Sequence, residues 1–539
     1  MRKRQFLAVL AVAGLARVAS GQGGPDSISA KRLRADLTFL ASDSLEGRLS
    51  LQRGSEAAAQ WVASEFAKAG LVPAAGDSFF QQIPLIEYRT DRSASRLIVK
   101  RGASGKTYEF PDVSGGFHDD IAISASVVFA GFGITAPELN YDDYAGIDAR
   151  GKIVLIFDHE PQENDPDSIF NGQGNTRHAG AFVKALNAQK HGAAAVLMVA
   201  EPNRKHPSNQ ERMARIPGGE QRRRRLPSQA LQDAEVRIPL LTIGETLASE
   251  LISTGGKTPT GLQASIDSAL KPVSFAIADS TVELRLANAS RRRGVETNII
   301  GILEGSDPAL RSETIVFSAH HDHDGLHDEN LYHGADDNGS GTVGVVELAR
   351  AFAASPARPK RTLMFAVFAA EERGLLGSYY YAAHPLRDLK TTRAVINFDM
   401  IGRNETPSRQ TDGLMEIAAD TSNDLNLIGT TYSPEYREAV ESQNRKVGLK
   451  LDYKWDYDSA LNIFFRSDQY PFALHNIPAV WWFTGFHPDY HQTTDSVEKI
   501  NFGKMAKILR LSYLSGSALA DGARPPRFIA NPKASAAGR

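Results

Sequence analysis

The second half of the chain alternates short apolar runs of strand length with helical segments. Strand-like runs lie at residues 298–303, 314–319, 362–368 and 394–398, with a helical pattern at 342–353. A late apolar run at 479–483 precedes a closing helix expected over 502–520. Such alternation packs buried strands beneath helices, so it predicts a mixed, largely parallel open α/β sheet flanked by helices.

The first half has a different texture. Residues 32–40 and 55–69 predict helices, and Gly70 is placed to end the second. From about residue 127 to 243 short β-rich runs are separated by turns, which predicts an inserted β-rich domain over 116–264. The sheet domain is then discontinuous, over residues 23–115 and 265–522, and residues 523–539 are expected to form a disordered tail.

The first 22 residues have the pattern of a secretory leader. Arg2, Lys3 and Arg4 precede an apolar stretch at 6–16, and small residues at 18–20 offer a cleavage position. The apolar stretch is shorter than the roughly 20 residues that span a bilayer, although an uncleaved anchor is an alternative. We expect an exported protein, periplasmic or secreted, with no integral membrane segment once the leader is removed.

The charge balance and the absence of cysteine limit which partners and which metal ligands this chain can use. The chain has 61 basic and 63 acidic residues and no cysteine. The near-neutral balance argues against a dedicated nucleic-acid-binding protein. Without cysteine, any metal site must use imidazole and carboxylate ligands. The arginine run at 222–225 is interpreted as a solvated loop, with an anionic-ligand patch as the alternative.

Potential metal ligands follow four of the predicted strands. Ligands of open α/β sheets bind beyond the carboxyl ends of the strands, so side chains at these ends are expected to converge. Converging carboxylates repel one another unless cations are present, and two divalent ions about 3.5–4 Å apart with a shared carboxylate resolve that repulsion. Zinc suits such ligands, with cobalt or manganese as substitutes. The residues are His320, Glu371, Glu372, Asp399 and His491, together with Asp336 and Asp337 in the glycine-rich loop 333–341.

Several segments of the second half resemble the M28 family of zinc aminopeptidases. The similar segments are SAHHDHDG (318–325), GADDNGSG (334–341), AAEERGLLGS (369–378), NFDMIGRN (397–404) and DYHQTTDSVEKIN (489–501). The resemblance covers about residues 296–520. It implies the zinc-exopeptidase fold, of the phosphorylase/hydrolase-like type.

The resemblance also implies a role for each matching residue. His320 and Asp399 would bind one zinc ion, Glu372 and His491 the other, and Asp337 would bridge both. Asp322 would orient His320, and Glu371 would be the general base for the metal-bridging water. Tyr490 is similar to a residue that hydrogen-bonds the oxyanion, with a packing tyrosine as an equal alternative. The neighbouring histidines have no matching ligand role and are interpreted as lining or surface residues: His321, His323, His327 and His333.

The β-rich insert resembles a second known module. Segments 127–156, 190–199 and 237–243 are similar to the protease-associated (PA) domain found inserted in many M28 peptidases, and segment 40–71 resembles the start of such enzymes. By resemblance, this PA-like domain would cover the active site or restrict substrate size. A passive structural insert fits the same residues.

The sequence therefore predicts an exported dizinc aminopeptidase that hydrolyses N-terminal residues of peptides. A carboxypeptidase or a dipeptidase on the same scaffold is an alternative, as is a glutaminyl cyclase with one zinc. A metal-free, receptor-like binding module is the alternative of a different class, and zinc content separates it from the enzymes. In the loop 465–470, Arg466 or Asp468 would contact a substrate terminus or form a structural ion pair. The sequence indicates no oligomeric state.

Overall fold

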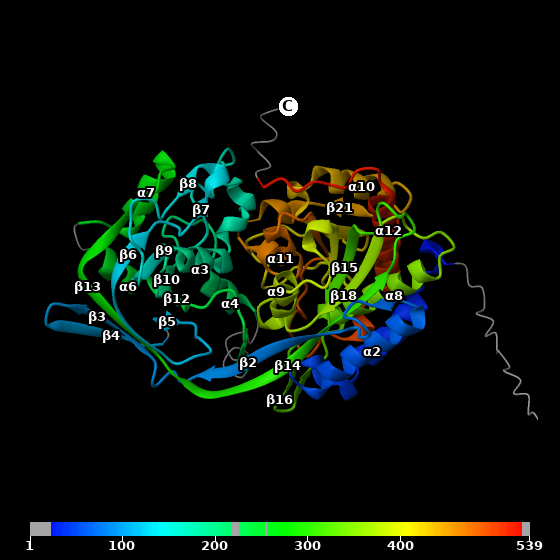
Figure 1. The fold of residues 1–539 in the computed structure, drawn as a ribbon, viewed down its shortest axis with the longest axis horizontal. Coiled ribbons are helices and arrows are strands. Elements are labelled where there is room, and N and C mark those ends of the chain that lie inside the picture. The colour runs from blue at the N-terminus through cyan, green and yellow to red at the C-terminus, as the bar shows by residue number, and fades with distance from the viewer. Residues whose placement is uncertain (1–22, 111, 217–225, 254–255, 459, 531–539) are drawn as a thin grey trace, which may run out of the picture.

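The computed structural model describes residues 23–110, 112–216, 226–253, 256–458 and 460–530. Figure 1 shows two units side by side, each built on its own large sheet, with long strands running from one unit to the other. The predicted leader and the arginine run at 222–225 lie outside the described residues.

The first unit contains a ten-stranded sheet in the order β11-β2-β14-β18-β15-β19-β22-β20-β21, with β1 paired to β14. Its four central strands, β18, β15, β19 and β22, are parallel, while β2, β14 and β11 continue it antiparallel on one side. The prediction of a mixed sheet with a parallel centre is confirmed. The strands are β1 (Val72–Pro73), β2 (Phe80–Thr90), β11 (Ser228–Leu231), β14 (Asn288–Leu303), β15 (Thr314–His320), β18 (Thr362–Phe368), β19 (Thr392–Phe398), β20 (Asp424–Ile428), β21 (Lys450–Asp452) and β22 (Ala479–Phe483).

Helices cover both faces of this sheet. Phe317 and Phe365 belong to the core under α1, α2, α8, α10 and α12, whereas the alternate residues Val316 and Met364 belong to the core under α9 and α11. Strands buried on both faces are expected at the centre of such sheets, and β15 and β18 are buried at every position. The helices are α1 (Ala30–Leu40), α2 (Arg53–Ala69), α8 (Gly341–Ala353), α9 (Leu376–Ala383), α10 (Pro434–Asn444), α11 (Gln469–Leu474) and α12 (Phe502–Asp521).

The second unit contains an eight-stranded sheet in the order β4-β3-β13-β6-β9-β10-β12-β5. Its strands are β3 (Arg96–Arg101), β4 (Ser104–Tyr108), β5 (Val113–Ser114), β6 (Ile121–Ala130), β9 (Ile153–Phe157), β10 (Ala195–Val199), β12 (Leu240–Ile243) and β13 (Ser274–Leu286). Its helices are α3 (Ala181–Lys190), α4 (Asn209–Arg215), α6 (Glu245–Ile252) and α7 (Pro259–Ala269). Two small hairpins complete the strand set: β7 (Thr135–Ala136) with β8 (Tyr141–Asp142), and β16 (Gly325–His327) with β17 (Asn330–Tyr332).

This second sheet extends beyond the predicted insert of residues 116–264. It also takes up β3, β4, β5 and β13, whereas β11, inside that range, pairs with β2 of the first sheet. The difference arises because β3 and β4 are short and partly exposed, and they join this sheet only through the pairing of β3 with β13, far away in the chain. We refer to the unit built on this sheet as the inserted unit.

The end of α2 agrees with the sequence prediction, whereas the segment 523–530 differs from it. Gly70 ends α2 in the left-handed conformation, with φ 80°, as expected. Residues 523–530, expected to be disordered, pack against the first unit: Phe528 stacks on Tyr432 and Arg527 pairs with Glu435. Among the helices of the described ranges, none combines the length and the apolar character that crossing a bilayer requires.

Candidate metal centre

Imidazole and carboxylate groups converge at the carboxyl edge of the first sheet. Two groups form there, with the potential ligand atoms of each within 4.8 Å of one another. Asp337, from the loop before α8, belongs to both. One group is His320, Asp337 and Asp399; the other is His323, Asp337, Glu372 and His491.

His320, the last residue of β15, directs one ring nitrogen at the carboxylates. Its Nε2 lies 3.7 Å from Asp337 Oδ1 and 3.6 Å from Asp399 Oδ1, and it has no hydrogen-bond partner within the part of the chain that the structure describes. Its Nδ1 lies 3.2 Å from the backbone carbonyl and 3.6 Å from the carboxylate of Asp322. Because a carbonyl only accepts, Nδ1 carries the proton, and the lone pair of Nε2 faces the carboxylates.

His491 repeats this arrangement from the loop after β22. Its Nδ1 lies 2.8 Å from Asp324 Oδ2, and its Nε2 lies 3.5 Å from Asp337 Oδ2 and 3.7 Å from Glu372 Oε2. Asp324 is in turn held by Arg373, whose Nη2 donates to Asp324 Oδ1 over 3.1 Å. An Asp thus holds the outer nitrogen of each histidine, an arrangement typical of metal-ligating histidines.

His323 lies inside the second group, although the sequence analysis gave it no ligand role. Its Nδ1 is 2.9 Å from Glu372 Oε1, and its ring stacks on that of His491. Its Nε2 is buried and finds no hydrogen-bond partner among the described ranges. The run of five consecutive His and Asp residues at 320–324 is the sequence signal that could have identified this position.

The adjacent residues Glu371 and Glu372 face different surroundings. Glu372 belongs to the second group, whereas Glu371 belongs to neither and places Oε2 3.7 Å from His320 Nε2. Their backbone amides both donate to Asp322, over 3.0 Å and 3.2 Å. Asp322 therefore fixes the turn that separates the two carboxylates.

Arg48, which the sequence analysis did not single out, ties the loops of the centre together. The guanidinium is fully buried and donates to the carbonyls of His321, His333 and Gly334, and to that of Leu40 in α1. Of the other nearby histidines, His321 is buried with Nε2 3.3 Å from the Thr297 carbonyl, His327 contacts the Asp324 carbonyl, and His333 pairs with Asp43.

The charges of the centre favour binding of a cation. Burial, reinforced by the charges of Glu372 and Asp399, raises the pKa of Asp337 well above its usual range. Burial likewise raises the pKa of Glu371, with Asp399 and Glu372 adding to the rise. Buried carboxylates that repel one another, facing imidazole nitrogens without a hydrogen-bond partner, are a donor set that fits divalent metal binding.

A cavity of about 330 Å³ opens over these groups. Asp337, Glu371, Glu372, Asp399 and His491 line its floor, and Tyr490 and Arg466 line its side, where Arg466 Nη2 donates to the Tyr490 hydroxyl over 3.1 Å. Asp468 is not among the lining residues; it is fully buried and accepts from Ser378 Oγ. The remaining wall is apolar, and two of its residues, Met213 and Ile216, come from the inserted unit. The other apolar residues of this wall are Leu375, Met400, Phe465, Trp481 and Phe486.

Comparison with known proteins places this region in one family. Residues 298–514 match the model of peptidase family M28, which confirms the resemblance seen in the sequence motifs. Leucine aminopeptidase 2 of Trichophyton rubrum is 27% identical over 227 residues, 38% of this chain and 41% of that protein. The probable lipoprotein aminopeptidase LpqL of Mycobacterium tuberculosis is 30% identical over 189 residues, 31% of this chain and 36% of that protein. The chain thus spans about two fifths of the length of these curated relatives.

A solved structure extends the likeness to the whole fold. The aminopeptidase from Aneurinibacillus sp. strain AM-1 aligns with a TM-score of 0.50 and 20% sequence identity. The alignment covers 94% of this chain and 96% of that one, so it extends over both units of this chain.

Proposed function

Because residues 298–514 match peptidase family M28, we propose that this chain is an exported dizinc aminopeptidase that removes N-terminal residues from peptides. One observation carries the proposal. The Nε2 atoms of His320 and His491 lie on either side of Asp337, 3.7 Å and 3.5 Å from its two carboxylate oxygens. A single carboxylate between two imidazole lone pairs is the arrangement that a pair of divalent ions requires.

We assign one ion to His320, Asp337 and Asp399, and the other to Asp337, Glu372 and His491. His323, next to Glu372, is a further candidate ligand of the second ion. Bound there, the two ions would polarise the scissile carbonyl and increase the acidity of the attacking water. Asp322 and Asp324 keep the protons of His320 and His491 on Nδ1, which leaves both Nε2 atoms available as ligands.

Glu371 is the proposed general base. Its carboxylate lines the cavity beside the first group but is outside both groups, so it is available to accept the proton of the attacking water. The same residue then delivers that proton to the leaving amine. Tyr490 lines the cavity within hydrogen-bonding distance of Arg466, and we assign to it the hydrogen bond to the developing oxyanion.

The apolar wall of the cavity favours an apolar N-terminal side chain in the substrate. Met213 and Ile216 extend that wall from the inserted unit, which supports the PA-like role of covering the site and limiting substrate size. A carboxypeptidase or dipeptidase would use the same ions and the same base. The distinction rests on which terminus of the peptide must be free.

A peptide panel with matched metal analysis tests the proposal. Four versions of one Leu-initiated peptide would be compared: unmodified, N-acetylated, C-amidated and doubly blocked. We expect release of leucine from the unmodified and C-amidated peptides only, by a protein that holds two zinc ions at its cavity. Equal cleavage of the N-acetylated peptide would exclude an aminopeptidase, and a cavity that binds no zinc would favour the receptor-like module.

A further inference from the structure

A second cluster of imidazole and carboxylate groups lies in the inserted unit. It consists of His159, Glu163, Glu201 and His206, whose potential ligand atoms lie within 4.8 Å of one another. No more than 4% of any of the four side chains is exposed. His159 and Glu163 follow β9, and Glu201 follows β10; because these strands are parallel neighbours, their carboxyl ends bring the residues together. None of the four belongs to the groups of the cavity.

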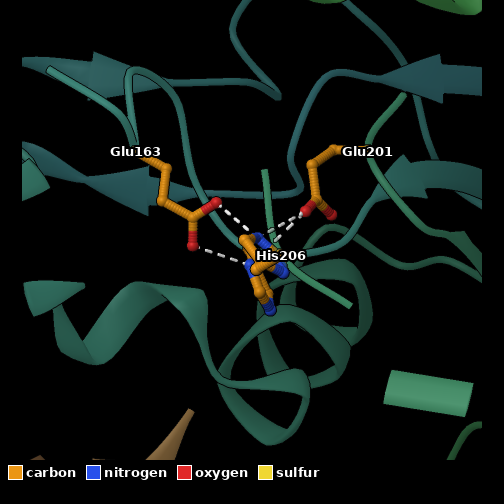
Figure 2. A group of neighbouring side chains, drawn as sticks. Glu163, Glu201 and His206 are labelled. Carbon is orange, nitrogen blue, oxygen red and sulfur yellow. Dashed lines mark hydrogen bonds and ion pairs between the residues drawn. The ribbon is translucent and has the colours of Figure 1, made fainter. Parts of the chain in front are cut away.

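His206 presents a lone pair to two carboxylates. Its Nδ1 lies 2.9 Å from the Pro207 carbonyl, which only accepts, so the proton of the neutral ring is on Nδ1. Its Nε2 lies 2.7 Å from Glu163 Oε2 and 3.0 Å from Glu201 Oε1. Figure 2 shows both carboxylates directed at the His206 ring. Three lone pairs thus meet at one buried point, so either a proton or a metal cation must lie between them.

Glu201 provides an independent indication. The residue is 2% exposed, and its Oε1 points at this meeting of lone pairs. Among the described residues this oxygen accepts no well-aligned hydrogen bond, and its contacts are His206 Nε2 at 3.0 Å and His159 Nδ1 at 3.5 Å. A buried carboxylate oxygen without a donor is costly unless a ligand satisfies it.

His159 has a different role in the cluster. Its Nε2 lies 3.3 Å from Nη2 of Arg212, a group that only donates, so its proton is on Nδ1. That Nδ1 lies 2.8 Å from Glu163 Oε1 and donates to it. His159 therefore orients Glu163 rather than acting as a ligand.

We propose that Glu163, Glu201 and His206 bind a divalent transition metal, at a third metal site separate from the cavity. One imidazole and two carboxylates suit zinc or manganese. The ligand atoms of a tetrahedral zinc ion lie roughly 3.3 Å from one another. The distances from His206 Nε2 to the two carboxylate oxygens are shorter than this, so each carboxylate would move away from His206 by a few tenths of an ångström when the metal binds. A proton is the competing occupant: although burial lowers the pKa of His206, the close carboxylates of Glu163 and Glu201 raise it to about 10.

The site is connected to the cavity through one short segment. His206 leads into α4, where Arg212 donates to the Ala460 carbonyl of the first unit over 3.0 Å. Met213 and Ile216 then line the cavity. A metal at His206 would fix the start of this segment and hold its apolar residues over the substrate. This consequence, unlike the metal site itself, rests on the proposed function.

Metal content of variants tests the site. The full chain would be saturated with zinc, dialysed and analysed for metal per chain as wild type, Glu201→Gln, Asp337→Asn and Glu138→Gln. Glu138 is the matched control because it pairs with His178 in the same unit, over 2.8 Å, outside any metal-binding group of the described residues. We expect three ions in wild type and in Glu138→Gln, two in Glu201→Gln, and retention of the third site in Asp337→Asn.

Equal zinc content in wild type and Glu201→Gln would overturn the third site. A different result would overturn the dizinc proposal and support the third site. In that case wild type would hold one zinc ion per chain, which Asp337→Asn would retain and Glu201→Gln would lose. As a second measurement, cobalt would be titrated into Asp337→Asn. One saturable visible absorption band is expected, and it should be absent from the Asp337→Asn/His206→Gln double variant; a band that persists there would contradict the assignment. In the active enzyme, Glu201→Gln should raise KM about 3–10-fold and leave kcat nearly unchanged.

Discussion

The backbone amide of Glu371 donates to the carboxylate of Asp322 over 3.0 Å. The same carboxylate accepts from the amide of Glu372 and lies 3.6 Å from Nδ1 of His320. One buried carboxylate therefore sets the positions of the proposed base and of a proposed ligand of each ion. Asp322 would therefore affect the reaction by positioning Glu371, Glu372 and His320, and not by contacting the substrate.

Replacing Asp322 by Asn tests this positioning. The Asn side chain offers one acceptor oxygen and directs an NH₂ group at a backbone N–H or at His320 Nδ1–H. Groups that support a metal ligand in this way typically change metal affinity or activity about 10–100-fold. We expect losses of that size in zinc affinity and in kcat/KM for Asp322→Asn. Glu329→Gln, exposed in the adjacent hairpin, serves as control and should match wild type.

Replacing Glu371 by Gln separates the base from the ligands. Gln keeps the shape of the side chain but accepts no proton, and general-base catalysis contributes about 10²–10⁴-fold. We expect kcat to fall by that factor with zinc content unchanged. Glu372→Gln, one residue away, should lower zinc content instead. Normal turnover by Glu371→Gln would show that another group accepts the proton.

The sequence predicted those parts of the centre that depend on strand ends. His320 ends one buried strand and Asp399 directly follows another, so their convergence could be inferred from the parallel sheet alone. His323 and Asp324 could not be assigned, because their orientation depends on Glu372 and His491, which the fold brings from elsewhere in the chain. The second cluster was missed for the same reason: Glu163 and Glu201 meet only because β9 and β10 pair. The extent of the inserted unit depended on β13, whose partners are distant in sequence.

Because Met213 of α4 lines the cavity, we expect its replacement by a charged residue to weaken substrate binding. Met213→Asp places a charge where an apolar side chain of the substrate would lie, and loss of a single buried methylene already costs about 1 kcal/mol. We expect KM for Leu-initiated peptides to rise about tenfold while kcat changes little. Ala214→Asp adds the same charge on the exposed side of α4 and should leave KM unchanged. An equal effect of both variants would attribute the change to the helix and not to the cavity.

Glu296 predicts how stability depends on pH. This β14 residue is 4% exposed and accepts from the Leu51 amide, the Thr297 amide and Ser55 Oγ, so it anchors the loop before α2. Burial raises its pKa from 4.5 to about 7. Because the folded chain holds this proton more tightly than the unfolded chain, the associated stability is fully present below pH 4.5 and is lost as the pH rises through 7. Glu296→Gln has no such proton to lose.

We therefore expect the thermal unfolding midpoint of wild type, measured relative to Glu296→Gln in saturating zinc, to fall steadily between pH 5 and pH 8. A difference between the two midpoints that stays constant, or that grows in favour of wild type with pH, would show that Glu296 is ionised in the folded protein throughout this range.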